Sequence, residues 1–156
     1  MTYQGNEGIR LSILDKFIKA NHHYNLAISH LEQQQYKEAL AEFNQTLALN
    51  PRYTLAFINR GKLQQQHLHH PNEAAADYEQ ALTLDPHDNQ TRYRLAVLYQ
   101  TMNQYQKSAQ HFRFIMIDVR WTKKNGASTA LHDFDTNQYQ SAAQEMHRIL
   151  SALDFH

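Results

Sequence analysis

The chain has 156 residues, no cysteine, and 15 basic against 15 acidic side chains, so its formal net charge is zero. The lack of cysteine excludes a disulfide framework, thiolate catalysis and cysteine-ligated zinc. A neutral balance gives no long-range attraction for nucleic acid or anionic lipid, and the apolar runs are far too short to span a membrane. We therefore expect no nucleic-acid partner and no membrane insertion. Because no secretory signal pattern opens the chain, we expect a cytoplasmic location.

The first segment predicts a helix. Residues 8–19 carry Ile9, Leu11, Ile13, Leu14 and Phe17 at helical spacing. We expect residues 1–19 to form a capping helix or extension that covers the amino-terminal end of the fold, or that runs straight into the next helix.

Six further helices follow in pairs. Apolar spacing predicts them at residues 21–33 and 36–49, 55–66 and 71–84, and 89–102 and 105–119. Pro51 and Pro86 close the first two pairs in the similar stretches LALNP and LTLDP, since proline cannot continue a helix. Pro71 fits the first turn of its helix, where its missing N–H costs nothing.

The carboxyl end is less regular. Residues 136–153 predict an amphipathic helix, whereas residues 123–135 contain Gly126 and few large apolar side chains. We expect a frayed helix at residues 128–134 or a loop, so that this part forms an incomplete last unit of the kind that caps a solenoid.

A repeat of 34 to 35 residues runs through these pairs. The stretch NQYQKSAQ at Asn103 returns as NQYQSAAQ at Asn137. A small, then an aromatic or large, then a large residue recurs four times, at Ala39, Phe43 and Leu47; Ala74, Tyr78 and Leu82; Ser108, Phe112 and Met116; and Ala142, Met146 and Leu150. This predicts an all-α solenoid of stacked antiparallel helix pairs, with repeats at 20–53, 54–88, 89–122 and a degenerate 123–156. The run HLHHP marks a one-residue insertion in the second repeat.

These residues resemble the tetratricopeptide repeat (TPR) family, firmly so from Ala20 to Val119. Its 34-residue unit prefers a large residue, Leu, a small residue and Tyr on its first helix, and Ala, an aromatic, Ala and a terminal Pro on its second. The matches are Leu26, Ala27, Ala39, Phe43 and Pro51; Phe57, Gly61, Ala74, Tyr78, Ala81 and Pro86; and Leu95, Ala96, Tyr99 and Phe112. The departures from the pattern are Thr46, Arg60, Ile115 and Arg120.

The stacking of such pairs implies a concave groove lined by the first helix of each repeat. The side chains that we place in it are Asn21, Tyr24, Asn25, Ile28 and Leu31; Leu55, Ile58, Asn59, Lys62 and Gln65; and Gln90, Tyr93, Arg94, Val97 and Gln100. Amide, aromatic and cationic groups in a trough suit an extended peptide or a helix of a partner protein.

The resemblance also allows a narrower test. Some chaperone-adaptor TPR domains hold a partner's terminal carboxylate with five Lys, Asn and Arg side chains. Asn59 and Arg94 occupy two of those places here, whereas the other three hold Tyr24, Ile28 and Gln90. Two donors are too few for a desolvated carboxylate, so we expect no full clamp, with Asn59 and Arg94 as polar anchors.

No pattern in the sequence indicates metal binding or catalysis. His67, His69 and His70 crowd one turn, but no metal-binding spacing accompanies them, and no nucleotide-binding or hydrolase motif exists. The adjacent His22 and His23 point apart on a helix. Asp133 and Asp135 are better explained as a helix start than as a catalytic pair, and Lys123 and Lys124 as solvated charges. We expect no enzyme activity, no cofactor and no metal.

The sequence therefore favours a non-catalytic adaptor that binds a peptide or helix in the groove, with Trp121, Phe134 and Phe155 at the carboxyl end as a second contact surface. Two alternatives stay open. The last helix, through Met146, Ile149 and Leu150, could pair with its copy to give a structural homodimer, or the groove could serve a regulatory peptide sensor.

Overall fold

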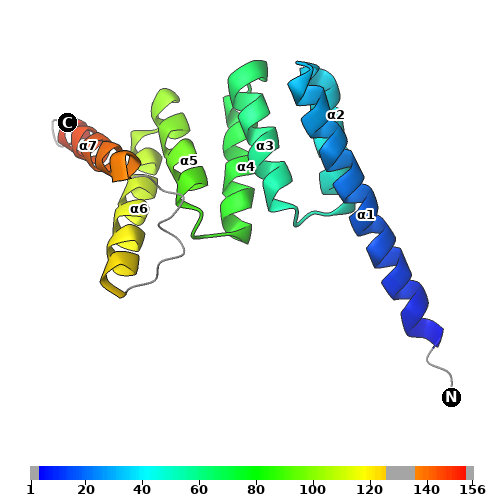
Figure 1. Ribbon diagram of the computed structural model, residues 1–156. Coiled ribbons are helices and arrows are strands. Elements are labelled where there is room, and N and C mark those ends of the chain that lie inside the picture. Colours follow the sequence, from blue (N-terminus) through cyan, green and yellow to red (C-terminus); the bar gives the residue numbers. More distant parts are fainter. Residues whose placement is uncertain (1–3, 126–135, 154–156) are drawn as a thin grey trace. The chain divides into compact units, whose positions relative to one another are not determined.

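The computed structural model describes residues 4–125 and 136–153, which form α-helices and one π-helix but no strand (Figure 1). The elements are α1 (Gln4–Glu32), α2 (Tyr36–Leu49), α3 (Thr54–Leu63), the π-helix η1 (Gln64–Leu68), α4 (Pro71–Leu84), α5 (Asn89–Thr101), α6 (Tyr105–Asn125) and α7 (Thr136–Leu153). The predicted all-α class is confirmed, and the predicted boundaries of α2, α4 and α7 coincide with the observed ones.

The chain divides into two compact units, of which unit 1 ends at His70 and unit 2 begins at Pro71. Unit 1 holds α1, α2, α3 and η1, and unit 2 holds α4 to α7. The division falls inside the predicted second repeat, between its two helices. The repeat boundaries themselves stay predictions.

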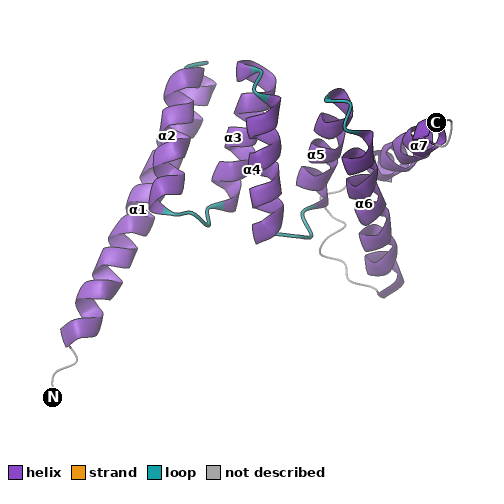
Figure 2. Ribbon diagram, turned by 180° about the vertical axis from the view of Figure 1, so that it is seen from behind, coloured by secondary structure: helices purple, strands orange, loops and turns teal. Residues whose placement is uncertain are grey.

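Unit 1 is built on the packing of α2 against α1. Its buried core comprises Ala27, Ala39, Phe43, Leu47, Ala56 and Leu63. The helices predicted at residues 8–19 and 21–33 are one continuous helix, and no glycine or proline interrupts residues 9–32. Its amino-terminal half extends past α2 in both ribbon views (Figures 1 and 2). The apolar residues of that half are exposed, so they cover no core within unit 1.

The turns inside the helix pairs repeat with the period of the sequence. Gln34, His69 and Asn103 adopt left-handed backbone with φ of 59°, 56° and 59°. After the first of them, the N–H of Gln35 bonds the carbonyl of His30 at 2.8 Å, and after the third, the N–H of Gln104 bonds that of Tyr99 at 2.8 Å. These bonds span five residues, as in the Schellman motif that ends many helices.

The predicted insertion lies in the middle turn. There the N–H of His70 bonds the carbonyl of Gln64 at 2.9 Å, so this bond spans one residue more than its counterparts. The preceding residues form the π-helix η1, whose wider turns absorb one extra residue without breaking the backbone hydrogen bonding.

Gln34→Gly should raise the free energy of unfolding by about 0.5 to 1 kcal/mol, because a side chain in left-handed backbone is strained and glycine is not. Urea unfolding followed by circular dichroism measures the change. Asn103→Gly is the control, and its gain should be smaller because asparagine tolerates this conformation. A loss of stability in Gln34→Gly would contradict the argument.

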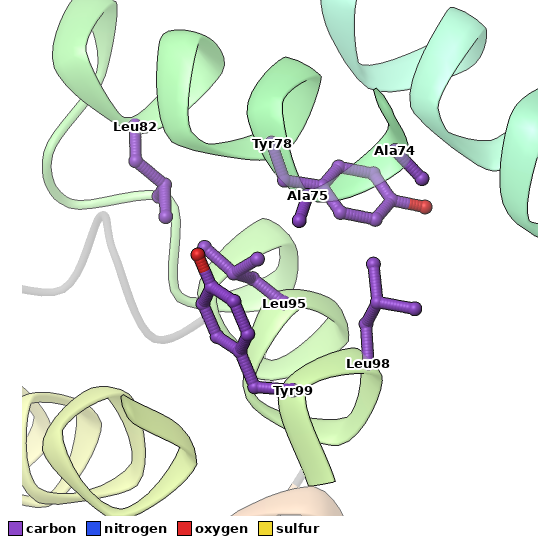
Figure 3. Packing of buried hydrophobic residues seen from close by; sticks show 7 residues of the cluster. All are labelled: Ala74, Ala75, Tyr78, Leu82, Leu95, Leu98 and Tyr99. Carbon is purple, nitrogen blue, oxygen red and sulfur yellow. The ribbon is translucent and has the colours of Figure 1, made fainter. Parts of the chain in front are cut away.

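Unit 2 has two adjoining buried clusters. The first lies between α4 and α5 and consists of Ala74, Ala75, Tyr78, Leu82, Leu95, Leu98 and Tyr99 (Figure 3). The second joins α5, α6 and α7 through Ala96, Ala109, Phe112, Ile115 and Ile149. Ile149 is 3% exposed, so α7 uses its apolar side inside the chain.

The first two repeat positions are buried in each of the first three repeats, whereas Met116 and Met146 at later positions are half-buried. Ala39, Ala74 and Ser108 are buried, as are Phe43, Tyr78 and Phe112. The small positions of the first helices are also buried, namely Ala27, Gly61 and Ala96. Burial at matched intervals confirms that the repeat in the sequence is the repeat of the core.

Candidate functional site

The predicted groove residues of unit 1 share one part of its structure. We call them the α1–α3 face, which consists of Asn21, Tyr24, Asn25 and Ile28 on α1, Leu55, Ile58, Asn59 and Lys62 on α3, and Gln65 on η1. Leu31, predicted with them, packs partly buried against the unit 1 core. Whether the α1–α3 face binds a ligand is a prediction, but its internal geometry is defined.

Tyr24 is the centre of this face. Its hydroxyl accepts a hydrogen bond from Asn59 Nδ2 at 2.7 Å, which joins α1 to α3. Its ring stacks on Tyr53, with centroids 4.8 Å apart and planes 21° from parallel. The hydroxyl of Tyr53 donates to Asn21 Oδ1 at 2.8 Å. The two tyrosines and the two amides therefore fix one another's orientation.

Lys62 extends this network toward solvent. Its Nζ donates to Asn59 Oδ1 at 3.4 Å, so both ends of the Asn59 amide are engaged. Burial raises the pKa of the Tyr24 phenol, and the hydrogen bond from Asn59 opposes that rise. Burial and the neighbouring Tyr24 raise the pKa of Tyr53. Both phenols stay neutral at physiological pH, and Lys62 supplies the positive charge.

Apolar side chains flank the polar network. Leu55 is 56% exposed, and Ile28 and Ile58 are half-buried. Asn25 is exposed beside them. The face thus combines oriented amides, two rigid aromatic rings and accessible aliphatic groups, a combination that can bind both the backbone and the side chains of a peptide.

The predicted groove residues of α5 lie in a different setting. Gln90 is exposed, but the Tyr93 hydroxyl lies 3.3 Å from Ser141 Oγ of α7, and Val97 packs on the cluster that contains Ile149. Gln100 donates a hydrogen bond to Glu145 of α7. This side of α5 is in contact with α7. The sequence predicted the helix α7 but not this contact.

Arg94, the predicted anchor in unit 2, lies near α4. Burial raises the pKa of Tyr78 to about 12, and the charge of Arg94 opposes that rise. Arg94 belongs to unit 2, whereas Asn59 belongs to unit 1.

Two of the histidines make contacts within unit 1. His23 Nδ1 lies 2.6 Å from Glu42 Oε2, and the His67 ring stacks on Tyr36 with centroids 4.1 Å apart. Within residues 4–125 and 136–153, no group of three or more His, Cys, Asp or Glu side chains is arranged to hold a metal ion. Asp133 and Asp135 lie outside the described residues, and no described helix is long and apolar enough to cross a membrane.

Sequence reasoning missed Tyr53, which stacks on the central tyrosine of the face. It lies between two predicted helices, and the repeat offers no signal for it, because Asp88 stands one period later. Its position two residues after Pro51, at the start of a helix, is the signal that could have drawn attention to it.

Comparison with known proteins identifies the fold. A tetratricopeptide repeat family model matches residues 23–53, which cover part of α1, all of α2 and the link to α3. No curated protein matches the chain in sequence.

Several solved structures are similar at low sequence identity. The Arabidopsis OM64 TPR domain has a TM-score of 0.65 and 14% identity, covering 85% of this chain and 98% of its own. The first TPR of Spaghetti (RPAP3), bound to the HSP90 peptide SRMEEVD, has a TM-score of 0.65 and 15% identity, covering 88% and 95%. The Yersinia enterocolitica type III secretion chaperone SycD, in complex with a peptide of the translocator YopD, has a TM-score of 0.61 and 12% identity, covering 86% and 92%. These likenesses confirm the predicted solenoid fold.

Proposed function

We propose, on the premise that this chain is a tetratricopeptide repeat protein, that it is a non-catalytic adaptor which binds a peptide or helix of a partner protein on the α1–α3 face. The observation that carries the proposal is the network of Asn21, Tyr53, Tyr24 and Asn59, whose members hold one another in place. Side chains that are ordered before binding lose little conformational entropy when a ligand arrives.

The comparisons support the same class of function. The Spaghetti domain and SycD each hold a peptide in the solved structures. At identities of 15% and 12%, the similarity shows a shared fold only, so we do not assign the peptide ligands of these two proteins to this chain. A full carboxylate clamp is not part of the proposal. Asn59 is bonded to Tyr24 and Lys62, and three of the five clamp places hold the uncharged Tyr24, Ile28 and Gln90.

The packing of unit 2 favours an internal role for α7. Self-association through that helix has less support than the adaptor role, because Met146 and Ile149 pack on the cluster with Ala96 and Phe112. Making these side chains polar would test the stability of unit 2 and not the oligomeric state.

Peptides selected from a random display library on the immobilised protein provide the probe. Asn59→Ala should weaken their binding about tenfold, because the substitution frees Tyr24 and Lys62 from their fixed positions. Fluorescence polarisation with labelled peptides measures the dissociation constants.

Asn44→Ala is the matched control, because it is also an asparagine-to-alanine substitution that removes a side-chain hydrogen bond. In this case the lost bond is the one that Asn44 Oδ1 accepts from Arg60 Nη1 at 2.7 Å. Its affinity should stay within about twofold of the parent protein. Equal binding by Asn59→Ala and the parent protein would reject the α1–α3 face, and Arg94→Ala tests the unit 2 residues separately.

A further inference from the structure

The amino-terminal half of α1 exposes an unusual amount of apolar surface. Six large apolar side chains within ten residues are between 52% and 65% exposed, namely Ile9, Leu11, Ile13, Leu14, Phe17 and Ile18. Scattered exposed apolar residues are normal, but a contiguous patch of this size marks a contact surface.

The six side chains share one side of the helix. At 100° per residue they fall within an arc of about 200°. The opposite arc carries Ser12, Asp15, Lys16 and Lys19, and Lys19 Nζ bonds Asp15 Oδ2 at 2.7 Å. This part of α1 is therefore amphipathic, with an ion pair on its polar side.

The apolar arc continues a row that is packed farther along the helix. Ala20 and Ala27 are buried and Tyr24 packs against the core of unit 1. Phe17 and Ile13 extend this row at spacings of three and four residues. The row is no longer packed beyond the end of α2, which lies near Asn21. Asn21 Oδ1 accepts the hydrogen bond from the Tyr53 hydroxyl.

We propose that a second copy of this chain covers the exposed row, with the two α1 helices paired antiparallel about a twofold axis near residues 13 and 14. The exposed area is on the order of 600 Å² on each chain, so a pair would bury roughly 1,200 Å², the lower end of specific interfaces. In this pairing the helices overlap only along their extensions, and the packed parts of the two α1 helices lie at opposite ends.

The position of Arg10 selects this register. Arg10 lies within the apolar arc, where a cation without a partner would be costly to desolvate. An axis between residues 13 and 14 brings Arg10 of each copy level with Phe17 of the other. A guanidinium over an aromatic ring is a favourable contact, and the twofold axis makes it twice.

Charge distinguishes a copy of the chain from a membrane surface. Helices that lie on anionic lipid carry several cations on their polar side. Here the polar arc has Lys16 and Lys19 against Asp15, and Asp15 is paired with Lys19, so only one positive charge remains in excess. The whole chain has a formal net charge of zero, so electrostatic repulsion between two copies is small.

Sedimentation velocity on the full chain tests the pairing. We expect reversible dimerisation with a dissociation constant of roughly 1 to 100 µM. Leu14→Glu should raise that constant at least about tenfold, with unchanged helicity, because the side chain is exposed in the monomer. Ser12→Glu adds the same charge to the polar arc and should dimerise like the parent protein.

The absence of cysteine allows the orientation to be tested by disulfide formation. Arg10→Cys and Phe17→Cys should crosslink when mixed and should crosslink far less when each is alone. Crosslinking of each variant only with itself would indicate parallel helices and overturn the proposal. A monomer at all concentrations would also overturn it, as would a dimer that Leu14→Glu leaves intact. So would a monomer that binds vesicles of phosphatidylcholine and phosphatidylserine through this helix.

Discussion

Phe112→Ala should lower the free energy of unfolding by about 3 to 5 kcal/mol, which is a large part of the total stability of a domain of this size. Phe112 is fully buried in the cluster that joins α5, α6 and α7. The Tyr93 ring meets it edge to face, with centroids 5.7 Å apart and an interplanar angle of 67°. Alanine would remove that contact and leave a cavity between three helices.

The control for this variant lies on the same helix. Ile117 is 60% exposed, so Ile117→Ala should change the free energy of unfolding by less than about 0.5 kcal/mol. Urea titrations followed by circular dichroism give both values from the midpoints and slopes. Comparable losses in the two variants would mean that the cluster around Phe112 does not hold unit 2 together.

The same position shows why the core could be predicted from the sequence. Phe43, Tyr78 and Phe112 recur at steps of 35 and 34 residues and are all buried. In a solenoid every repeat packs against its neighbours in the same way, so each repeat requires a large side chain at the same place and small ones around it. Periodicity therefore reports burial directly, without knowledge of long-range contacts.

Features outside the repeat were harder to predict. The sequence left open whether residues 1–19 cap the fold or run straight into the helix predicted at residues 21–33, and in the structure they run into it as α1. The insertion at HLHHP was recognised, whereas its form, a π-helix followed by left-handed His69, depends on backbone hydrogen bonds that composition does not encode.

The candidate site could be predicted only in part, because helical spacing places residues on a face but does not show which helix packs against that face. Tyr24 and Asn59 were assigned to one face from helical spacing, and the hydrogen bond between them joins the two helices. Tyr93 and Val97 were assigned to an open groove, yet they contact α7. That contact links residues more than forty positions apart, and no periodic signal specifies where a terminal helix packs.

Acid should destabilise unit 2 through His111. Burial of the ring, with the nearby charge of Arg92, lowers the pKa of His111 from 6.5 to about 4, while Glu79 opposes the shift and Lys107 adds to it. The ring stacks on Tyr99 with centroids 5.7 Å apart, and Arg92 Nη1 lies 3.5 Å from Nδ1. The folded state therefore holds the neutral imidazole.

The direction of the pH effect follows from this shift. Above pH 6.5 the imidazole is neutral in both the folded and the unfolded chain, and its full contribution to stability is present. As the pH falls toward about 4, the unfolded chain binds a proton that the folded chain does not, so stability is lost. With an allowance for partial solvent screening, we expect a loss of about 1 to 2 kcal/mol between pH 7 and pH 5.

His111→Phe should remove this part of the pH dependence, because phenylalanine keeps an aromatic ring beside Tyr99 and cannot bind a proton. Urea unfolding at a series of pH values measures the slope for the parent protein and the variant. His147→Phe removes an exposed histidine from α7 in the same unit and should leave the slope close to that of the parent protein. If His111→Phe retained the full slope, the acid sensitivity would have to arise from other titratable groups and not from this imidazole.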